Sequence, residues 1–182
     1  EVRERAMRVS LETLQAAARL EAKYVVLHMG EVELFQGHEA TRTLQRMARH
    51  GYVGSAEYAK VKGEVVRRRM KLAPIYLNRA KEALYQLAEK AKEYNLVLGV
   101  EGRSHFEQVP GECEFPDLMA EFADNPHVRY WHDFGHIQRK HNLLLLNHDQ
   151  YLAGLKPYLY GAHVNDVQWP QRDHRAPFFG GD

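Results

Sequence analysis

Four apolar runs in this sequence end in side chains able to bind a metal ion or move a proton. The residues at these ends are His28, Glu101, Asp133 with His136, and His163 with Asp166. A carboxylate directly after the apolar stretch 98–100 is costly to bury without a cation or an arginine beside it. Two carboxylates and an imidazole suit a divalent cation such as Mn, Mg, Co or Zn. Such a cation polarises a carbonyl or hydroxyl group, so the pattern indicates proton transfer beside a carbonyl.

The elements that would position these residues alternate between helix and strand. Apolar spacing predicts helices near 7–18, 39–49, 56–70, 75–94, 116–123 and 143–155, and strands at 24–28, 96–100, 128–132 and 159–164. This alternation predicts an α/β fold with parallel strands and right-handed crossovers. The carboxyl ends of parallel barrel strands lie on one face, where active sites are built. Each residue taken alone also fits an ordinary cap or turn. Their expected location on one face of the barrel is what favours a functional site.

Composition limits the class of protein. The 182 residues have 45% hydrophobic and 27% charged content and a formal net charge of +1, which fits one globular domain over 1–182 and gives no general attraction to nucleic acid. The length is short for a complete (β/α)8 barrel, which takes about 250 residues. The single Cys113, and the lack of a signal peptide or a long apolar span, favour a cytoplasmic protein without a membrane partner.

Five segments of the sequence resemble a known superfamily. They are LHMG at 27–30, VEGR at 100–103, YWHDFGHIQ at 130–138, GAHVNDV at 161–167 and RDHRAPFFGGD at 172–182. In order and spacing they are similar to the xylose-isomerase-like TIM-barrel superfamily of sugar phosphate isomerases and epimerases, from about residue 24 onward. The resemblance implies a TIM (β/α)8-type barrel that is partial here. Its first strands, and its last strand with a fourth ligand, a Glu, are expected to lie outside these residues.

The resemblance also implies roles for individual residues. Glu101, Asp133 and His163 match the metal ligands of the family, and Glu101 matches one of two acid–base carboxylates. His136 matches a residue that contacts substrate or a second metal and takes part in catalysis. The remaining matches line the substrate pocket: His28 at a strand end, and Asp173 with His174 as a DH pair.

Three functions follow as hypotheses. The first is a metal-dependent isomerase or epimerase of carbohydrate metabolism, which moves a proton next to the carbonyl of a sugar or sugar phosphate through an enediolate. The second is a multi-zinc apurinic endonuclease-like phosphodiesterase, against which the near-neutral charge stands. The third is a non-catalytic barrel remnant. An open barrel would expose strand edges, so a natural chain of this kind is expected to associate with another chain, for example as a homo-oligomer.

A few other residues have two interpretations each. Arg103, two positions beyond Glu101, could reach that carboxylate or bind a substrate phosphate. The basic run of Arg67, Arg68, Arg69 and Lys71 points around a helix and is interpreted as a solvated surface rather than a phosphate site. Trp131 and Trp169 fit either the wall of a pocket or the core.

Overall fold

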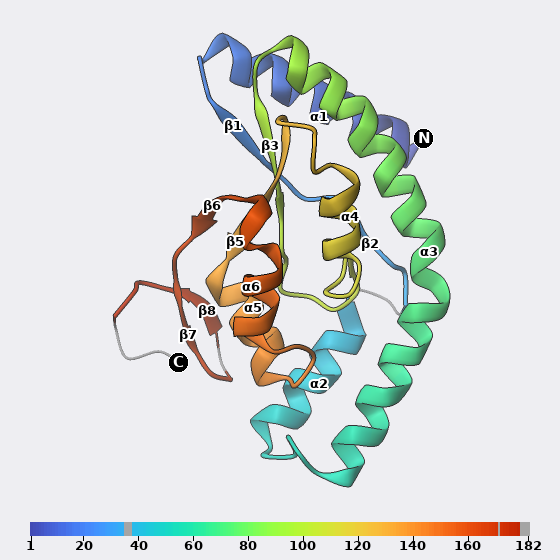
Figure 1. The fold of residues 1–182 in the computed structure, drawn as a ribbon. Coiled ribbons are helices and arrows are strands. Elements are labelled where there is room, and N and C mark those ends of the chain that lie inside the picture. The colour runs from blue at the N-terminus through green and yellow to red at the C-terminus, as the bar shows by residue number, and fades with distance from the viewer. Residues whose placement is uncertain (35–37, 171, 179–182) are drawn as a thin grey trace.

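The fold is built on a parallel sheet with helices packed against it (Figure 1). This computed structural model describes residues 1–34, 38–170 and 172–178, with the side chain of Asp173 left out. The sheet has the order β1-β3-β5-β6, and every neighbouring pair is parallel. Its strands are β1 (Tyr24–Leu27), β3 (Val97–Glu101), β5 (Val128–Asp133) and β6 (Leu159–His163). The predicted α/β class with parallel strands is therefore confirmed.

One helix precedes the first strand, and the other helices lie in the connections between successive strands. They are α1 (Val2–Arg19), α2 (Glu39–Arg49), α3 (Ala56–Glu93), α4 (Phe115–Glu121), α5 (Phe134–Asn142), α6 (His148–Leu155) and the 3-10 helix η2 (Lys156–Tyr158). In Figure 1, α1 lies beside the C-terminal half of α3 and α2 lies near its N-terminal half. None of the helices among the described residues is long and apolar enough to cross a membrane.

Two short antiparallel pairs, which the sequence did not predict, complete the structure. β2 (Gly30–Glu31) pairs with β4 (Gln108–Val109), so the loops that follow β1 and β3 are joined beyond the strand ends. β7 (Asp166–Gln168) pairs with β8 (Arg172–Arg175) beyond the end of β6. Both pairs lie beyond the carboxyl ends of the strands of the parallel sheet.

The two faces of the sheet differ in what they pack against. On the helix side, Leu98, Val100 and Tyr130 are fully buried in a core shared with α1, α3 and α4. On the other side, Trp131 stacks on Tyr24 with ring centroids 4.8 Å apart. A Cβ on Gly161 would lie 2.3 Å from the Trp131 ring, so only glycine leaves room for the indole there. Alternate residues of each strand therefore serve the core and the opposite face.

Helix α3 differs from its prediction. The sequence predicts two helices, at 56–70 and 75–94, but the structure has one helix of 38 residues that contains Pro74. A proline inside a helix removes a backbone hydrogen bond and usually breaks the helix. Here Ala73 and Ala80, on either side of the proline, are buried in the same apolar cluster. Packing along the whole length of the helix outweighs the local preference of the proline.

The segment after β5 also differs from its prediction. A helix was expected at 143–155, whereas the structure has α5 directly after β5 and a shorter α6 from His148. Asp133 caps α5 by accepting a hydrogen bond from the backbone N–H of His136 at 2.8 Å. Asn147 caps α6 by accepting one from the N–H of Gln150 at 3.0 Å. Both caps are typical helix-start residues, and the prediction overlooked them.

Candidate metal centre

Three of the predicted residues meet at the carboxyl ends of adjacent strands. Glu101 is the last residue of β3, Asp133 of β5 and His163 of β6. The strands pair in parallel register, with Asp133 directly opposite His163. One ligand atom from each of the three side chains lies within 4.8 Å of the others. The parallel topology therefore gathers two carboxylates and an imidazole in one place.

Glu101 is held as an anion by two histidines. Its side chain is buried and accepts hydrogen bonds from Nε2 of His28 on one oxygen and from Nδ1 of His163, at 2.8 Å, on the other. Burial by itself would raise the pKa of Glu101, but the hydrogen bonds from His28 and His163 outweigh it and lower the pKa to about 2. The group is thus a carboxylate at neutral pH, the form a cation needs.

The two carboxylate oxygens of Asp133 differ in their hydrogen bonds. Oδ1 accepts from the backbone N–H of His136 at 2.8 Å and from Nδ2 of Asn165 at 3.2 Å. Oδ2 is buried and has no hydrogen-bond partner among the described residues. It faces Nδ1 of His163 at 3.4 Å, Nδ1 of His136 at 3.7 Å and Nε2 of His174 at 3.8 Å. A buried carboxylate oxygen among imidazole nitrogens fits a divalent cation, which would complete its interactions.

A second group of possible ligands shares Asp133. It consists of Asp133, His136 and His174, whose ligand atoms also lie within 4.8 Å of one another. The rings of His136 and His174 have centroids 4.9 Å apart. Nδ1 of His136 donates to the carbonyl of Gly102 at 3.2 Å, which fixes the orientation of this ring.

Comparisons with known proteins identify the fold. No protein-family model and no curated protein matches the chain. Among solved structures, a D-tagatose 3-epimerase-like protein aligns with 90% of this chain and 50% of its own, at a TM-score of 0.53 and 17% identity. The 3-keto-D-glucoside 4-epimerase YcjR from E. coli, in its apo form, aligns with 88% of this chain and 50% of its own, at a TM-score of 0.53 and 15% identity. A xylose isomerase domain protein from Planctomyces limnophilus aligns with 88% and 41%, at a TM-score of 0.45 and 12% identity.

The fold is that of a partial TIM barrel with a parallel sheet. The chain spans about half the length of the first two of these proteins. At such low identity the likeness concerns the fold alone. In a TIM barrel the active site lies at the carboxyl ends of the strands, which is where Glu101, Asp133 and His163 stand in this structure.

The other predicted site residues lie around this end of the barrel. His28 follows β1 and contacts Glu101 directly. His174, on β8, reaches Asp133 as described above. Arg103 forms no ion pair with Glu101 in the described part of the chain, and its Nε is buried without a hydrogen-bond partner there. The side chain of Asp173 lies outside the described residues. Asn165, which donates a hydrogen bond to Asp133 at 3.2 Å, was not among the predicted site residues.

Several histidines of the barrel are structural. Tyr130 donates its hydroxyl to Nδ1 of His132 at 2.7 Å, and Nε2 of His132 lies 3.0 Å from Nε2 of His148. His148 in turn is 2.8 Å, through Nδ1, from Oε1 of Gln138. Burial and the neighbouring His148 lower the pKa of His132 to about 4. This neutral network joins β5, α5 and α6 behind the site, so it fixes the backbone on which Asp133 stands.

The interpretation of the basic run as solvated surface is wrong for Arg69. This side chain is only 5% exposed. Its guanidinium donates to the carbonyls of Phe106 at 2.7 Å and Gln108 at 2.8 Å, and to both oxygens of Glu114 at 2.6 and 2.9 Å. Arg69 therefore holds the loop between β3 and α4 against α3. Arg67, by contrast, is exposed and pairs with the exposed Glu64.

The two tryptophans of the barrel have different roles. Trp131 lies beneath the site, with its ring edge-on to that of His163 at a centroid distance of 5.3 Å. Trp169 packs against a separate apolar cluster that includes Leu44 and Tyr58. Trp131 is thus buried between the rings of Tyr24 and His163, and Trp169 belongs to the core, as one of its two interpretations held.

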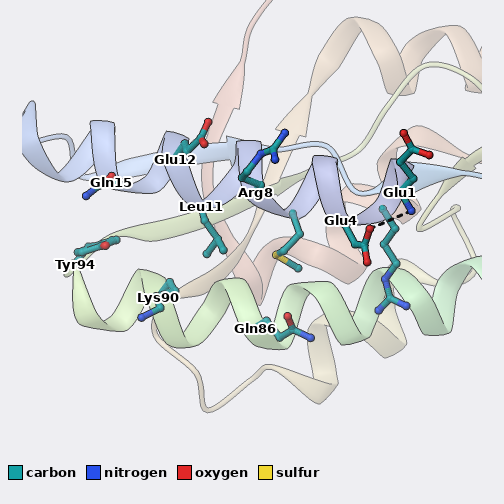
Figure 2. A pocket seen from close by; sticks show the side chains of 11 residues that line it. Glu1, Glu4, Arg8, Leu11, Glu12, Gln15, Gln86, Lys90 and Tyr94 are labelled. Atoms are coloured by element: carbon teal, nitrogen blue, oxygen red, sulfur yellow. Dashed lines mark ion pairs between the residues drawn. The ribbon is translucent and has the colours of Figure 1, made fainter.

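The hollow shown in Figure 2 is separate from this centre. It measures about 810 Å³ and lies between α1 and α3, where Met7 and Leu11 line it together with charged side chains such as Arg8 and Lys90. None of the candidate metal ligands lines it. We interpret it as the groove between two packed helices, because it lacks the convergent ligands that the strand ends provide.

Proposed function

We propose that this chain forms the cation-binding part of a metal-dependent sugar epimerase or isomerase. The observation that supports the proposal most is Oδ2 of Asp133, a buried atom that accepts no hydrogen bond from the described residues and lies among three imidazole nitrogens beside Glu101. The structural likeness to proteins described as a D-tagatose 3-epimerase-like protein and a 3-keto-D-glucoside 4-epimerase adds to it. Because the chain spans about half of those proteins, the activity is proposed for the whole protein.

Glu101, Asp133 and His163 would hold the cation. When bound, the cation would polarise a sugar carbonyl or hydroxyl and make a proton on the neighbouring carbon easier to remove. His28 holds Glu101 in place from one side, and Asn165 holds Asp133 from the other. His136 stands beside both carboxylates with its ring fixed by Gly102, so we assign it to contact with the substrate.

The acid–base role of Glu101 depends on its surroundings. A carboxyl group with a pKa of about 2 is a good ligand but a weak base at neutral pH. Two hydrogen bonds from histidines cause the low value, and the bond from His28 comes from a half-exposed side chain. A substrate that displaces His28 from Glu101 would raise the basicity of this carboxylate. We therefore assign Glu101 to both cation binding and proton transfer, with the second role requiring the substrate.

The first experiment is elemental analysis of the purified protein after incubation with Mn²⁺ and removal of excess ion. We expect about one cation per chain, strongly reduced in Glu101→Gln and Asp133→Asn and unchanged in His50→Gln, which alters an exposed histidine away from the strand ends. The loaded protein would then be tested for exchange of the C3 proton of D-tagatose with solvent deuterium. Absence of bound metal in the unmodified protein would contradict the proposal.

One observation favours a second candidate, a multi-metal phosphodiesterase. The group Asp133, His136 and His174 shares Asp133 with the first group, so the two could hold a pair of cations. Paired cations stabilise both the attacking and the leaving oxygen in phosphodiester cleavage. The formal net charge of +1 gives little attraction to a nucleic acid. Two or more cations per chain in the same elemental analysis would favour this candidate over the epimerase.

A further inference from the structure

A cluster of basic side chains lies next to the candidate metal centre and is not used by it. Arg103 and His105 belong to the loop after β3, Arg139 to α5 and His38 to the start of α2. The rings of His38 and His105 stack with centroids 4.1 Å apart and planes inclined by 10°. Arg103 and Arg139 lie near enough to His105 for their charges to act on it, so segments distant in the sequence bring these side chains into one neighbourhood.

Three of these side chains have buried nitrogens without a hydrogen-bond partner among the described residues. Among the described residues, neither Nε of Arg103 nor Nδ1 of His105 has a hydrogen-bond partner, although both atoms are buried. Nδ1 of His38 also lacks a hydrogen bond, with Oε2 of Glu31 at 3.4 Å as its nearest carboxylate contact. Buried nitrogen donors are nearly always satisfied in folded proteins. Their shared lack of a partner indicates that a ligand supplies the acceptor.

The nearby carboxylate of the loop is already engaged. Glu107 is buried and accepts hydrogen bonds from the backbone N–H of Thr41, at 3.0 Å, and from its hydroxyl. Both of its oxygens thus bind the first turn of α2. Burial, together with the charges of His38, Arg139 and Arg103, lowers the pKa of His105 to about 4 against the opposing effect of Glu107. His105 is therefore a neutral imidazole at neutral pH.

The cluster adjoins the cation ligands through two backbone connections. Gly102, which accepts a hydrogen bond from His136 at 3.2 Å, directly precedes Arg103. Arg139 follows His136 by three residues on α5, about 4.5 Å further along the helix axis. A ligand that touches His136 with one end is thus close to the basic cluster with its other end.

We propose that Arg103 and His105, with Arg139 beside them, form an oxyanion subsite for the far end of the substrate. The ligand would be a sugar that carries a phosphate or a carboxylate group. Guanidinium groups bind both kinds of oxyanion through paired N–H donors, and a neutral imidazole adds a further donor. This inference rests on the proposed function for the reacting end of the sugar. The subsite itself is independent of bound metal.

The test measures binding of inorganic phosphate to metal-free protein by calorimetry and by NMR of ¹⁵N-labelled side chains. We expect about one phosphate per chain, with shifts at Nε of Arg103 and Nδ1 of His105. Arg103→Gln should weaken binding at least tenfold and Arg103→Lys less, because lysine keeps the charge but loses the Nε donor. Arg67→Gln, at an exposed arginine on α3, is the matched control and should bind like the unmodified protein. A parallel titration with acetate decides between a phosphorylated sugar and a sugar acid.

The NMR shifts come from the unmodified protein, so the test does not depend on the folding of a variant. No saturable binding of either anion, shifts at other sites, or equal weakening in Arg67→Gln would overturn the subsite. Cation binding without anion binding would refute this inference and leave the proposed function standing. Anion binding that depends on Arg103, in a protein that takes no cation, would support the subsite and contradict the proposed function.

Discussion

Substitution of Asp133 by asparagine separates the two roles of this residue, as the cap of α5 and as a candidate metal ligand. Oδ1 caps α5 and accepts from Asn165, whereas Oδ2 is unpaired and faces three imidazole nitrogens between 3.4 and 3.8 Å away. Asparagine keeps an oxygen for the cap but replaces the ligand charge with an amide. We therefore expect Asp133→Asn to keep the fold and to lose cation binding. An amide also costs less to bury than an unpaired carboxylate, so the metal-free variant should unfold no more easily than the unmodified protein.

The magnitude follows from linkage between binding and folding. A cation present at 100 times its dissociation constant stabilises the folded state by about 2.7 kcal/mol. For a chain of this size, 1 kcal/mol corresponds to roughly 2–4 °C in Tm, so Mn²⁺ should raise the Tm by about 5–11 °C. Asp133→Asn should remove that increase. Asp133→Ala should also lose the cap of α5, at a cost of about 0.5–2 kcal/mol in the metal-free protein.

The assay is thermal unfolding followed by circular dichroism, with and without Mn²⁺. Asp124→Asn, which changes an exposed aspartate before β5, serves as the control and should keep the full increase in Tm. If Asp133→Asn retains the increase, Oδ2 is not a ligand and the reasoning about the unpaired oxygen is refuted. A similar loss in the control would show instead that the effect of Mn²⁺ is non-specific.

Three other predictions concern the loop after β3. Arg69→Met should lower the free energy of unfolding in urea by about 3–5 kcal/mol, because it leaves the largely buried carboxylate of Glu114 without its cation, whereas Arg67→Met should change it by under about 0.5 kcal/mol. Burial raises the pKa of Glu114, but the hydrogen bonds and charge of Arg69 outweigh it and lower the pKa. The Arg69–Glu114 pair should therefore stabilise the fold fully above the unfolded carboxyl pKa of about 4.3, and this stabilisation should be lost as pH falls through the lower pKa of the folded state. Glu114→Gln should remove that part of the acid dependence of stability. An unchanged acid profile in this variant would contradict the prediction. Thr41→Val should cost about 1–3 kcal/mol by removing the hydroxyl bond to buried Glu107, and Thr41→Ser should restore most of it in the same urea titrations.

The sequence by itself determined the class of fold and the residues at the strand ends. Strand ends are visible locally, because an apolar run stops at a charged residue such as Glu101 or Asp133. Alternation of helix and strand implies parallel strands, and parallel strands bring their carboxyl ends to one side. These two local properties predicted that the strand-end residues would meet on one side, and the resemblance singled out Glu101, Asp133 and His163 among them. The ligand atoms of these three residues lie within 4.8 Å of one another in the structure.

Only the tertiary structure decided features that depend on partners distant in the chain. Arg69 looks like any exposed arginine in the sequence, yet it is buried because Glu114 and the carbonyls of the loop stand 37 to 45 residues away to receive it. Pro74 continues a helix because apolar neighbours from other elements pack on both sides of it. The unpaired Oδ2 of Asp133 and the unpaired Nε of Arg103 are likewise properties of a folded neighbourhood. Local periodicity reports which face of an element is apolar, but the partner that meets each polar atom is set by how the elements pack together.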